Sequence, residues 1–341
     1  GISFQWYFRV IFRKDGVSDY SVGTVVRFVR QVCYLFYKLR GGEPPETHQQ
    51  ALDDFVSRDA ELESQTFDRP ADFVFMTVLR SVMHRILGSF DAGRIIPRHG
   101  PGAVSTGEKP WEKMNFRRFI PRLDKEYPYT EYFYLNTAHL CSDLANYLSM
   151  VECDPSAKIV LVPKDARGPR VISAEPLELQ WIQQGVMRAL VGHLEAHPIT
   201  MGHVWFTNQA PNQEAARAGS LSGDSVTLDL KEASDRVSLR LCERILPATL
   251  YRKVHSCRSQ ITRLPDGRSV VLRKFAPMGS ALCFPIMATI IFATAVTARL
   301  IQRRPSLAYS MKEVLEAAKD ITVFGDDIVV RDDLRRSLWR P

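Results

Sequence analysis

The sequence lacks the cysteine patterns of a zinc site or of a secreted disulfide framework. It has no Cys-x-x-Cys pair, and its cysteines are scattered along the chain: Cys33, Cys141, Cys153, Cys242, Cys257 and Cys283. Several of them stand among apolar residues, so we interpret them as reduced core residues of a cytosolic protein. The sequence also has no internal repeat and no low-complexity tract, and we expect no secretory signal peptide.

Long uncharged runs are scarce as well. Residues 281–298 form an uncharged segment that just reaches membrane-spanning length. Pro285 and several threonines interrupt this segment, and Arg299 closes it. A helix buried inside a large protein therefore fits better than the alternative, a membrane span.

What is present is a basic chain of ordinary globular composition. Its 341 residues are 45% hydrophobic, enough for one large core or two domains. The net charge is +7 and the isoelectric point is about 9.1, which suggests a polyanionic partner. Residues 252–274 contain seven Lys or Arg side chains and one acidic residue, Asp266. We expect this segment to contact nucleic-acid phosphates, the alternative being a solvated basic face.

A candidate catalytic hairpin lies near the end of the chain. Residues 322–330 read Thr-Val-Phe-Gly-Asp-Asp-Ile-Val-Val. Two apolar runs rich in β-branched residues flank the Gly-Asp-Asp triplet, which predicts a β-hairpin with the triplet at its turn. The adjacent carboxylates of Asp326 and Asp327 repel each other unless a cation lies between them. Mg²⁺ suits this place, because it is held by carboxylates together with substrate phosphates.

A Gly-Asp-Asp triplet often occurs by chance, so the hypothesis of a Mg²⁺ site needs further carboxylates in support. Residues 225–230 form another β-type run that carries Asp229 near its end, and Asp235 follows six residues later. Between the two stretches, residues 276–285 form a loop around Gly279 and Ser280 that leads into the apolar segment 281–298.

A basic hairpin precedes these elements. Residues 158–164 and 170–174 read as two strands around a turn, with Lys164, Arg167 and Arg170 at or beside it. Guanidinium and ammonium groups suit the oxygens of a triphosphate. The alternative is an exposed basic hairpin without a ligand.

These elements occur in a fixed order along the chain: a strand that ends in an aspartate, a glycine loop that leads into a helix, and a hairpin with two aspartates. This order resembles motifs A, B and C of the polymerase palm. The chain is similar to the replicase subunit of single-stranded RNA bacteriophages of the levivirus type. Val-Pro-Lys at residues 162–164, followed by Arg170 and Glu-Pro at residues 175–176, resembles motif F of that family. The likeness runs from about residue 158 to about residue 330 and is weak before residue 94.

The resemblance implies an α+β right-hand polymerase fold with fingers and palm, the palm being an antiparallel sheet backed by helices. It implies an N-terminal helical region at 1–93, fingers at 94–220 with the motif F hairpin at 158–176, and a palm at 221–341. Within the palm, motif A is expected at 225–238, motif B at 276–298 and motif C at 321–331. Helices are expected at 20–40, 49–63, 71–90, 131–150, 177–194 and 281–298.

The function that the resemblance implies is RNA-directed RNA synthesis for a phage genome. Asp229, Asp326 and Asp327 would hold two Mg²⁺ ions, with Mn²⁺ as the alternative ion. The side chains of Lys164, Arg167 and Arg170 would hold the nucleotide triphosphate. The partners would be RNA template and product, nucleoside triphosphates and, by resemblance, the host translation elongation factors Tu and Ts, in the cytoplasm of the bacterial host and without a membrane.

Asp235 is implied to read the ribose 2′-hydroxyl, its alternative role being a helix cap. Family members have Gly-Asn-Gly where this chain has Gly279-Ser280-Ala281, which makes Ser280 the candidate partner of Asp235. Asp235 and Gly325 favour a ribonucleotide polymerase over a reverse transcriptase. An RNA-binding protein with a decayed palm is the non-enzymatic alternative.

The resemblance also implies that motifs D and E and a thumb follow Pro341. We therefore expect residues 1–341 alone to be poorly soluble and inactive in elongation. The edge of the motif C hairpin and apolar side chains near Leu334, Leu338 and Trp339 would be exposed.

Overall fold

A computed structural model of the chain describes residues 20–37, 45–165 and 168–338. Its α-helices are α2 (Tyr20–Tyr37), α3 (Pro45–Glu61), α4 (Pro70–Leu87), α5 (Pro121–Asp124), α6 (Tyr129–Tyr132), α7 (Thr137–Ser142), α8 (Leu144–Leu148), α9 (Leu177–Ala196), α10 (Ala210–Ser222), α11 (Ala233–Arg236), α12 (Leu239–Ile245), α13 (Ala248–Ser256), α14 (Cys283–Arg303), α15 (Met311–Ala318) and α16 (Asp332–Leu338). Short 3-10 helices are η1 (Leu62–Ser64) and η2 (Pro110–Glu112). The strands are β1 (Arg118–Phe119), β2 (Val151–Glu152), β3 (Ala157–Asp165), β4 (Gly168–Ala174), β5 (Val204–Trp205), β6 (Ser225–Asp229), β7 (Ile261–Arg263), β8 (Ser269–Val271), β9 (Thr322–Phe324) and β10 (Asp327–Arg331).

The chain forms two compact units. One contains the described residues up to Asp53 together with Leu161–Val171, which is the outer part of the β3–β4 hairpin. The other contains Asp54–Val160 and the described residues from Ile172 onward. The second unit therefore holds the predicted motifs A, B and C, whereas the basic side chains of the predicted motif F belong to the first.

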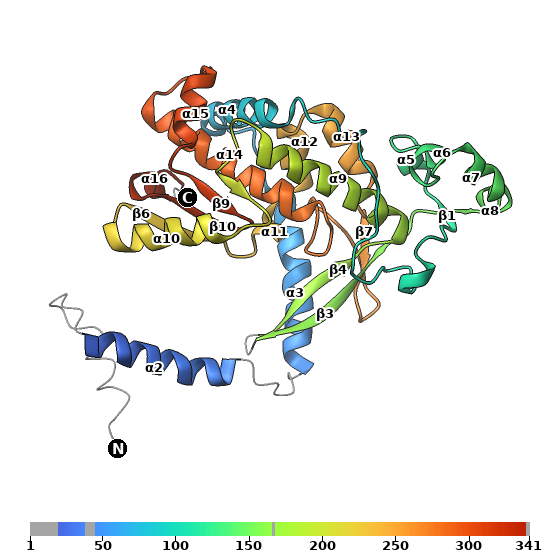
Figure 1. Ribbon diagram of the computed structural model, residues 1–341, viewed down its shortest axis with the longest axis horizontal. Coiled ribbons are helices and arrows are strands. Elements are labelled where there is room, and N and C mark those ends of the chain that lie inside the picture. Colours follow the sequence, from blue (N-terminus) through green and yellow to red (C-terminus); the bar gives the residue numbers. More distant parts are fainter. Residues whose placement is uncertain (1–19, 38–44, 166–167, 339–341) are drawn as a thin grey trace. The chain divides into compact units, whose positions relative to one another are not determined.

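A four-stranded sheet in the order β5-β9-β10-β6 carries the predicted motifs A and C. Strand β10 pairs antiparallel with both β9 and β6, and β5 is added parallel to β9. Helices α10 and α14 pack against this sheet (Figure 1). The predicted α+β class is confirmed, with one difference: the sheet is mixed because of β5.

The two faces of this sheet differ in polarity because side chains alternate along a strand. Val323, Ile328 and Val330 are buried in the main core. The neighbouring positions on β10, Asp327 and Val329, face the other way. The register pairs them with Asp229 and Thr227 of β6, so one face is apolar and the other bears the carboxylates.

Helix α14 is the central helix of the core. It is long because residues 283–298 are uncharged and mostly apolar and because Pro285 lies in its first turn, where proline costs no hydrogen bond. Among the described residues it is the one helix long and apolar enough to cross a membrane, but 78% of its most apolar stretch is buried inside the protein. This burial favours the predicted core helix over the membrane span.

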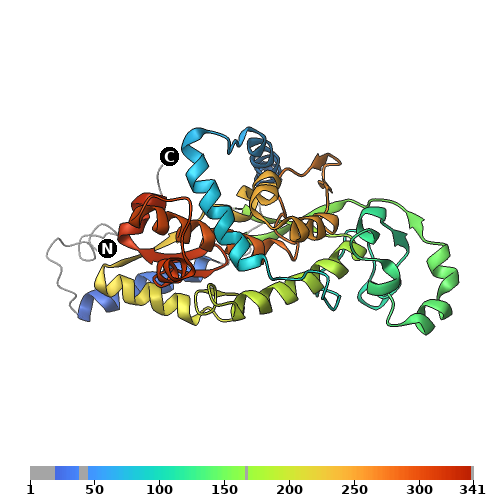
Figure 2. The ribbon, with the colours of Figure 1, turned by 90° about the horizontal axis from the view of Figure 1, so that it is seen from above.

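A second sheet, in the order β4-β3-β7-β8, holds the basic hairpin. The hairpin was predicted at residues 158–174, and the structure gives β3 and β4 at nearly the same bounds. Its inner end is anchored in the second unit, where Ala157 pairs with Thr262 and Lys158 pairs with Arg263. Figure 2 shows the short helices α5 to α8, in green, at the end of this unit opposite the red strands of the first sheet.

Two sequence-based expectations about these elements are wrong. The single helix expected at residues 131–150 is broken into α6, α7 and α8. The break arises because the Asn136 side chain accepts a hydrogen bond from the backbone N–H of His139 and so begins a new helix. The hairpin edge expected to be exposed is not an edge, because β9 and β10 lie between β5 and β6.

Leu334, expected to be exposed, is fully buried in the main core. Trp339 and the side chain of Leu338 lie outside the described residues. The predicted division into 1–93, 94–220 and 221–341 stays a prediction.

Candidate active site

Asp229 and Asp327 face each other across two neighbouring strands. Asp229 ends β6 and Asp327 begins β10, and the antiparallel register makes them direct partners. Side chains of directly opposed residues point to the same face, with Cβ atoms about 5 Å apart. The strand pairing thus brings together two carboxylates that are far apart in the sequence.

Asp326 joins them from the hairpin turn. Phe324 and Asp327 are register partners, so Gly325 and Asp326 form a two-residue turn. Gly325 has φ +66°, as expected for a glycine at the first position of a type II′ turn. A Cβ atom at Gly325 would lie 2.3 Å from the ring of Phe284, so this position requires glycine for its φ and for its space.

The carboxylates influence one another electrostatically. The pKa of Asp327 is raised, first by partial burial and then by the negative charges of Asp326 and Asp229. Asp326 is exposed and Asp229 is exposed. Like charges directly opposite each other in a sheet are destabilising, so this arrangement is better explained by function than by stability.

These carboxylates are the residues that could hold a hard cation. Oxygen donors on one face of a sheet are the ligand type that Mg²⁺ prefers, and a cation would relieve the repulsion that raises the pKa of Asp327. Among the described residues, no three His, Cys, Asp or Glu side chains already form a closed metal-binding group. The strand register and the turn place the three aspartates beside one another on the backbone.

Asp235 has a different environment. It lies on α11, directly after the turn that follows β6, and its side chain is 14% exposed. Its Oδ1 atom is 3.3 Å from the Nζ atom of Lys274, whose side chain is fully buried. The expected partner, Ser280, is instead bound elsewhere: its hydroxyl donates to Oε1 of Gln183 at 3.0 Å. Ser280 is therefore wrong as the partner of Asp235, while its role in nucleotide binding stays a prediction.

The loop that precedes α14 is fixed by residues from distant elements. Gln183 of α9 also accepts a hydrogen bond from the backbone N–H of Ala281 at 3.3 Å. Gly279 has φ +115°, and a Cβ atom there would lie 2.2 Å from the carbonyl oxygen of Ser173 on β4. The backbone N–H of Ser173 donates to the carbonyl of Met278 at 2.7 Å. The predicted motif B loop is thus held between α9 and the base of the basic hairpin.

Cys283, the first residue of α14, lies close to both groups of carboxylates. Burial raises the pKa of its thiol to about 12, and the negative charges of Asp235 and Asp326 add to the shift. Cys283 therefore stays a neutral thiol at physiological pH. All the described cysteines are free thiols. Cys242, Cys257 and Cys283 are buried, as expected for core residues, but Cys33 and Cys141 are exposed, so the core placement is wrong for these two.

The basic residues predicted to bind a triphosphate lie on the hairpin. Lys164 is on β3 and Arg170 is on β4, and both are exposed. Arg167 lies outside the described residues. Their role in nucleotide binding stays a prediction.

The basic segment 252–274 contains both exposed and buried cations, and its contact with nucleic-acid phosphates stays a prediction. Its cations have partners inside the protein. Arg258 is 3% exposed and donates to the carbonyls of Phe275, Leu272 and Lys274. The remaining pairs are Arg252 with Glu126, Lys253 with the Glu126 carbonyl, Arg263 with Ser156, Arg268 with Asp266, Arg273 with Glu63, and Lys274 with Asp235. The charge count could not reveal that Arg258 and Lys274 are buried, whereas Arg252, Arg263, Arg268 and Arg273 are exposed.

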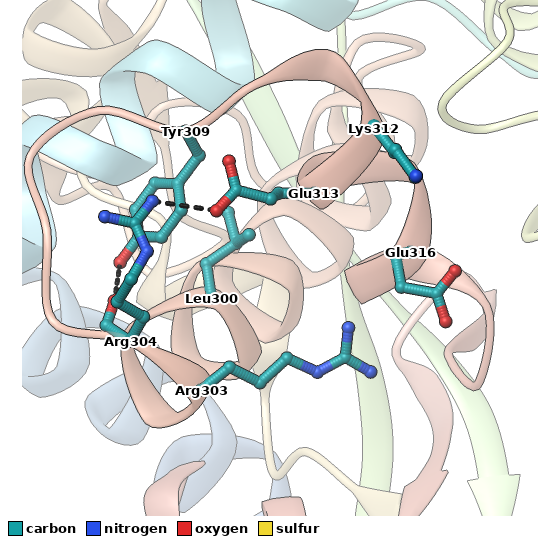
Figure 3. A pocket seen from close by; sticks show the side chains of 7 residues that line it. All are labelled: Leu300, Arg303, Arg304, Tyr309, Lys312, Glu313 and Glu316. Carbon is teal, nitrogen blue, oxygen red and sulfur yellow. Dashed lines mark hydrogen bonds and ion pairs between the residues drawn. The ribbon is translucent and has the colours of Figure 1, made fainter.

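One open pocket lies elsewhere on the second unit. It has a volume of about 180 Å³ and is lined by Leu300, Arg303, Arg304, Tyr309, Lys312, Glu313 and Glu316 (Figure 3). Arg304 is paired with Glu313 at 2.7 Å across it. Leu300 is 16 residues from Phe284 along α14, or about 24 Å at 1.5 Å per residue. This pocket is therefore separate from the aspartate cluster.

Sequence reasoning missed Lys274 and Gln183 as contributors to the site. Lys274 was counted only as part of a basic run, and Gln183 only as part of a helix. The one available signal was the position of Lys274, a charged residue directly before the apolar stretch Phe275 to Met278.

Comparison with known proteins places these motifs in a family. The family model described as "RNA replicase, beta-chain" matches residues 123–340, which include all the aspartates discussed above. The "RNA-directed RNA polymerase subunit beta" of Escherichia virus Qbeta is 34% identical over 180 residues, covering 52% of this chain and 28% of that protein. The protein of the same name from Qbeta virus (strain MX1) is 31% identical over 206 residues, covering 60% of this chain and 32% of that protein.

The chain spans about a third of the length of these curated relatives. A solved structure of the RNA-dependent RNA polymerase from bacteriophage phi12 overlaps 83% of this chain and 52% of its own, with a TM-score of 0.43 and 12% identity. The family model alone matches well over half of the residues. This chain therefore belongs to the family of RNA replicase beta-chains.

Proposed function

We propose that this chain carries the catalytic aspartates of an RNA-directed RNA polymerase that copies a phage RNA genome. The observation that carries the proposal is the cross-strand pair of Asp229 and Asp327, with Asp326 beside it in the hairpin turn. The names of the relatives describe RNA-directed RNA polymerase subunits, which supports the same activity for this chain.

The reaction joins the 3′-hydroxyl of a growing RNA to the α-phosphate of a nucleotide and releases pyrophosphate. Such a transfer needs no covalent nucleophile on the protein; it needs positioned reactants and neutralised charge. Mg²⁺, when bound, would act as a Lewis acid toward the attacking and leaving oxygens. Asp229 and Asp326 would hold two such ions, or Mn²⁺ in their place, and Asp327 would assist.

The other residues of the chain would bind and orient the nucleotide. Lys164, Arg167 and Arg170 would hold the triphosphate, since their side chains match phosphate oxygens in charge and geometry. Asp235 would accept a hydrogen bond from the ribose 2′-hydroxyl. The loop around Gly279 and Ser280, fixed by Gln183, would set the position of the sugar and base.

The RNA template and product and the nucleoside triphosphates follow from this activity. The relatives are named as beta subunits, which indicates that they assemble with other proteins. By family resemblance we infer the host elongation factors Tu and Ts as partners, in the cytoplasm of the infected bacterium.

One assay distinguishes the proposed function from two alternatives, a reverse transcriptase and a non-catalytic RNA-binding protein. The full-length protein is given an RNA template, a primer, Mg²⁺ and radiolabelled ribonucleotides or deoxyribonucleotides. An RNA polymerase incorporates the ribonucleotides, and a reverse transcriptase incorporates the deoxyribonucleotides. Incorporation of neither, with RNA binding retained, would indicate an RNA-binding protein with a decayed palm and would overturn the proposal.

A further inference from the structure

We propose that Lys274 is a positioning residue for sugar selection, which fixes the carboxylate of Asp235 so that it can meet the ribose 2′-hydroxyl. This inference rests on the proposed polymerase function and adds a residue and a mechanism to it. Lys274 lies 39 residues after Asp235 in the sequence, outside the motif B segment predicted from residue 276 onward.

The Lys274 side chain is held on several sides. It is fully buried, and its Nζ atom lies 3.6 Å from the centre of the Phe55 ring and 3.4 Å from the Phe55 carbonyl oxygen, to which it donates. The third contact is the Asp235 carboxylate at 3.3 Å. Burial lowers the pKa of Lys274, while the charges of Asp235 and Asp59 oppose that shift. A buried ammonium needs such partners, because an unpaired buried charge is strongly destabilising.

The backbone of Lys274 is fixed as firmly as its side chain. Asp59 of α3 is fully buried. Its carboxylate accepts hydrogen bonds from the backbone N–H groups of Lys274 at 3.0 Å and Arg273 at 3.0–3.1 Å. The end of α3 thus determines where the ammonium of Lys274 is placed.

The same end of α3 also holds the turn that carries Asp235. Glu232 is the only non-glycine residue with positive φ in the described part of the chain, at 57°, and it forms an ion pair with Arg58 of α3. One turn further, Arg236 pairs with Glu61 at 2.9 Å. A strained backbone position persists only where its surroundings hold it, so this turn is built to keep Asp235 in one place.

The alternative role for Asp235, a helix cap, does not fit this geometry. Asp235 is the third residue of α11, and the cap position belongs to Glu232, which makes no side-chain capping bond. Lys274 contacts Oδ1 of Asp235. This orientation leaves Oδ2 as an acceptor for a hydroxyl group, while the partial exposure of the side chain gives a ligand access.

The test measures discrimination between sugars, not total activity. For the full-length protein, kcat/KM is determined for a ribonucleotide and for the matching deoxyribonucleotide, and their ratio is compared among variants. The ratio does not depend on the fraction of protein that is folded. A residue that only stabilises the fold would lower both values and leave the ratio unchanged.

We expect Asp235→Ala and Lys274→Met each to lower the ratio by roughly tenfold or more, because a site built around a hydroxyl discriminates through that group. The double variant should lower it no further than Asp235→Ala alone, since Lys274 acts through Asp235. Phe55→Leu, which keeps the ammonium but removes the ring beneath it, should lower the ratio by about two- to threefold.

Lys253→Met is the matched control. Lys253 also lies over an aromatic ring, that of Tyr127 at 4.7 Å, and donates to a backbone carbonyl, that of Glu126 at 2.9 Å. It has no contact with Asp235, so its replacement should leave the ratio within about twofold of the wild-type value.

An unchanged ratio in both Lys274→Met and Phe55→Leu, in a wild-type protein that prefers ribonucleotides, would overturn the positioning role and leave the polymerase function intact. The positioning role would also be overturned if Lys274→Met lowered the sugar ratio as much in the Asp235→Ala background as in the wild-type protein. The two residues would then act independently. If the wild-type protein incorporates no nucleotide of either kind, the proposed function itself fails.

Discussion

The carboxylate of Asp235 and the cluster of Asp229, Asp326 and Asp327 have opposite electrostatic surroundings. Asp235 has its counter-ion inside the protein, the fully buried Lys274. Asp229, Asp326 and Asp327 lie together at the end of the sheet, and the pKa of Asp327 is raised by burial and by the other two charges. Asp235 is thus neutralised by a side chain of the protein, whereas no Lys or Arg side chain of the described residues forms an ion pair with the cluster, which suits it to a cation from solution.

This difference matches the two proposed roles, which are positioning of the sugar by Asp235 and binding of the reactive cations by the other three aspartates. A fixed internal ion pair keeps a hydrogen-bonding group at one place and is suited to recognising a sugar. An uncompensated cluster is costly for the fold and is suited to holding cations that take part in the reaction. Variants of the two groups should therefore fail in different ways.

The largest effect is expected for Asp326→Asn. Removing one carboxylate from the turn should lower nucleotide addition by about a thousandfold or more, since it removes charge stabilisation at the reacting atoms. Binding of RNA, measured by filter retention, should survive. Asp320→Asn is the matched control, because Asp320 is exposed and precedes β9 on the same hairpin. Wild-type turnover in Asp326→Asn would refute the catalytic assignment.

The second prediction concerns the stability of the hairpin turn and uses Gly325→Ala. A Cβ atom there would clash with the Phe284 ring and oppose a φ of +66°, so we expect a loss of about 1–3 kcal/mol in the free energy of unfolding. Gly102→Ala is the control, since a Cβ atom at Gly102 meets nothing within 4 Å. Chemical denaturation measures both. Equal stability of the two variants would show that the turn is not constrained as described.

The third prediction compares the basic hairpin β3–β4 with the basic segment 252–274. Arg170→Met should raise the KM for nucleotides by about tenfold, because an exposed guanidinium that binds phosphate is lost. Arg268→Met should change the KM by less than about twofold, since Arg268 is paired with Asp266 at 2.6 Å. Steady-state kinetics on both variants tests the assignment. A larger change for Arg268→Met would return phosphate binding to the segment 252–274.

The smallest change in the free energy of unfolding is expected for Asp327→Asn. This variant should be more stable than wild type, whereas Gly325→Ala should be less stable. Removing one of two opposed charges should raise the free energy of unfolding by about 0.5 kcal/mol at neutral pH, although activity is lost. The folded-state pKa of Asp327 lies above its unfolded value. Its ionisation therefore costs stability progressively as pH rises from the unfolded pKa, about 4, through the raised folded pKa.

Thermal unfolding between pH 3 and pH 7 measures this contribution. The wild-type protein should lose stability relative to Asp327→Asn over the lower part of that range. A variant less stable than wild type at pH 7 would mean that the Asp327 charge has a favourable partner in the fold.

Much of the site could be predicted from sequence because its elements are locally encoded. The hairpin 322–330 shows its strands in the β-branched runs and its turn in Gly325, and the structure confirms it. The strand before Asp229 and the helix after Gly279 are encoded in the same local way. The order of these elements then sufficed to indicate the family.

The parts that could not be predicted depend on contacts between distant segments. The partner of Asp235 is placed by Asp59, more than 200 residues from Lys274. The charge run at 252–274 gave no sign that Arg258 would be buried among carbonyl groups. Periodicity likewise missed the interruption at Asn136, since a single side-chain cap decides it.

We propose that Asp229, Asp326 and Asp327 bind divalent cations and that Asp235 does not. To test this, the full-length protein is titrated with Mn²⁺ and the free Mn²⁺ is followed by electron paramagnetic resonance. We predict that Asp229→Asn and Asp327→Asn each weaken Mn²⁺ binding by about tenfold or more, whereas Asp235→Asn leaves it within about twofold. Undiminished binding in the first two variants, or a loss confined to Asp235→Asn, would contradict the account.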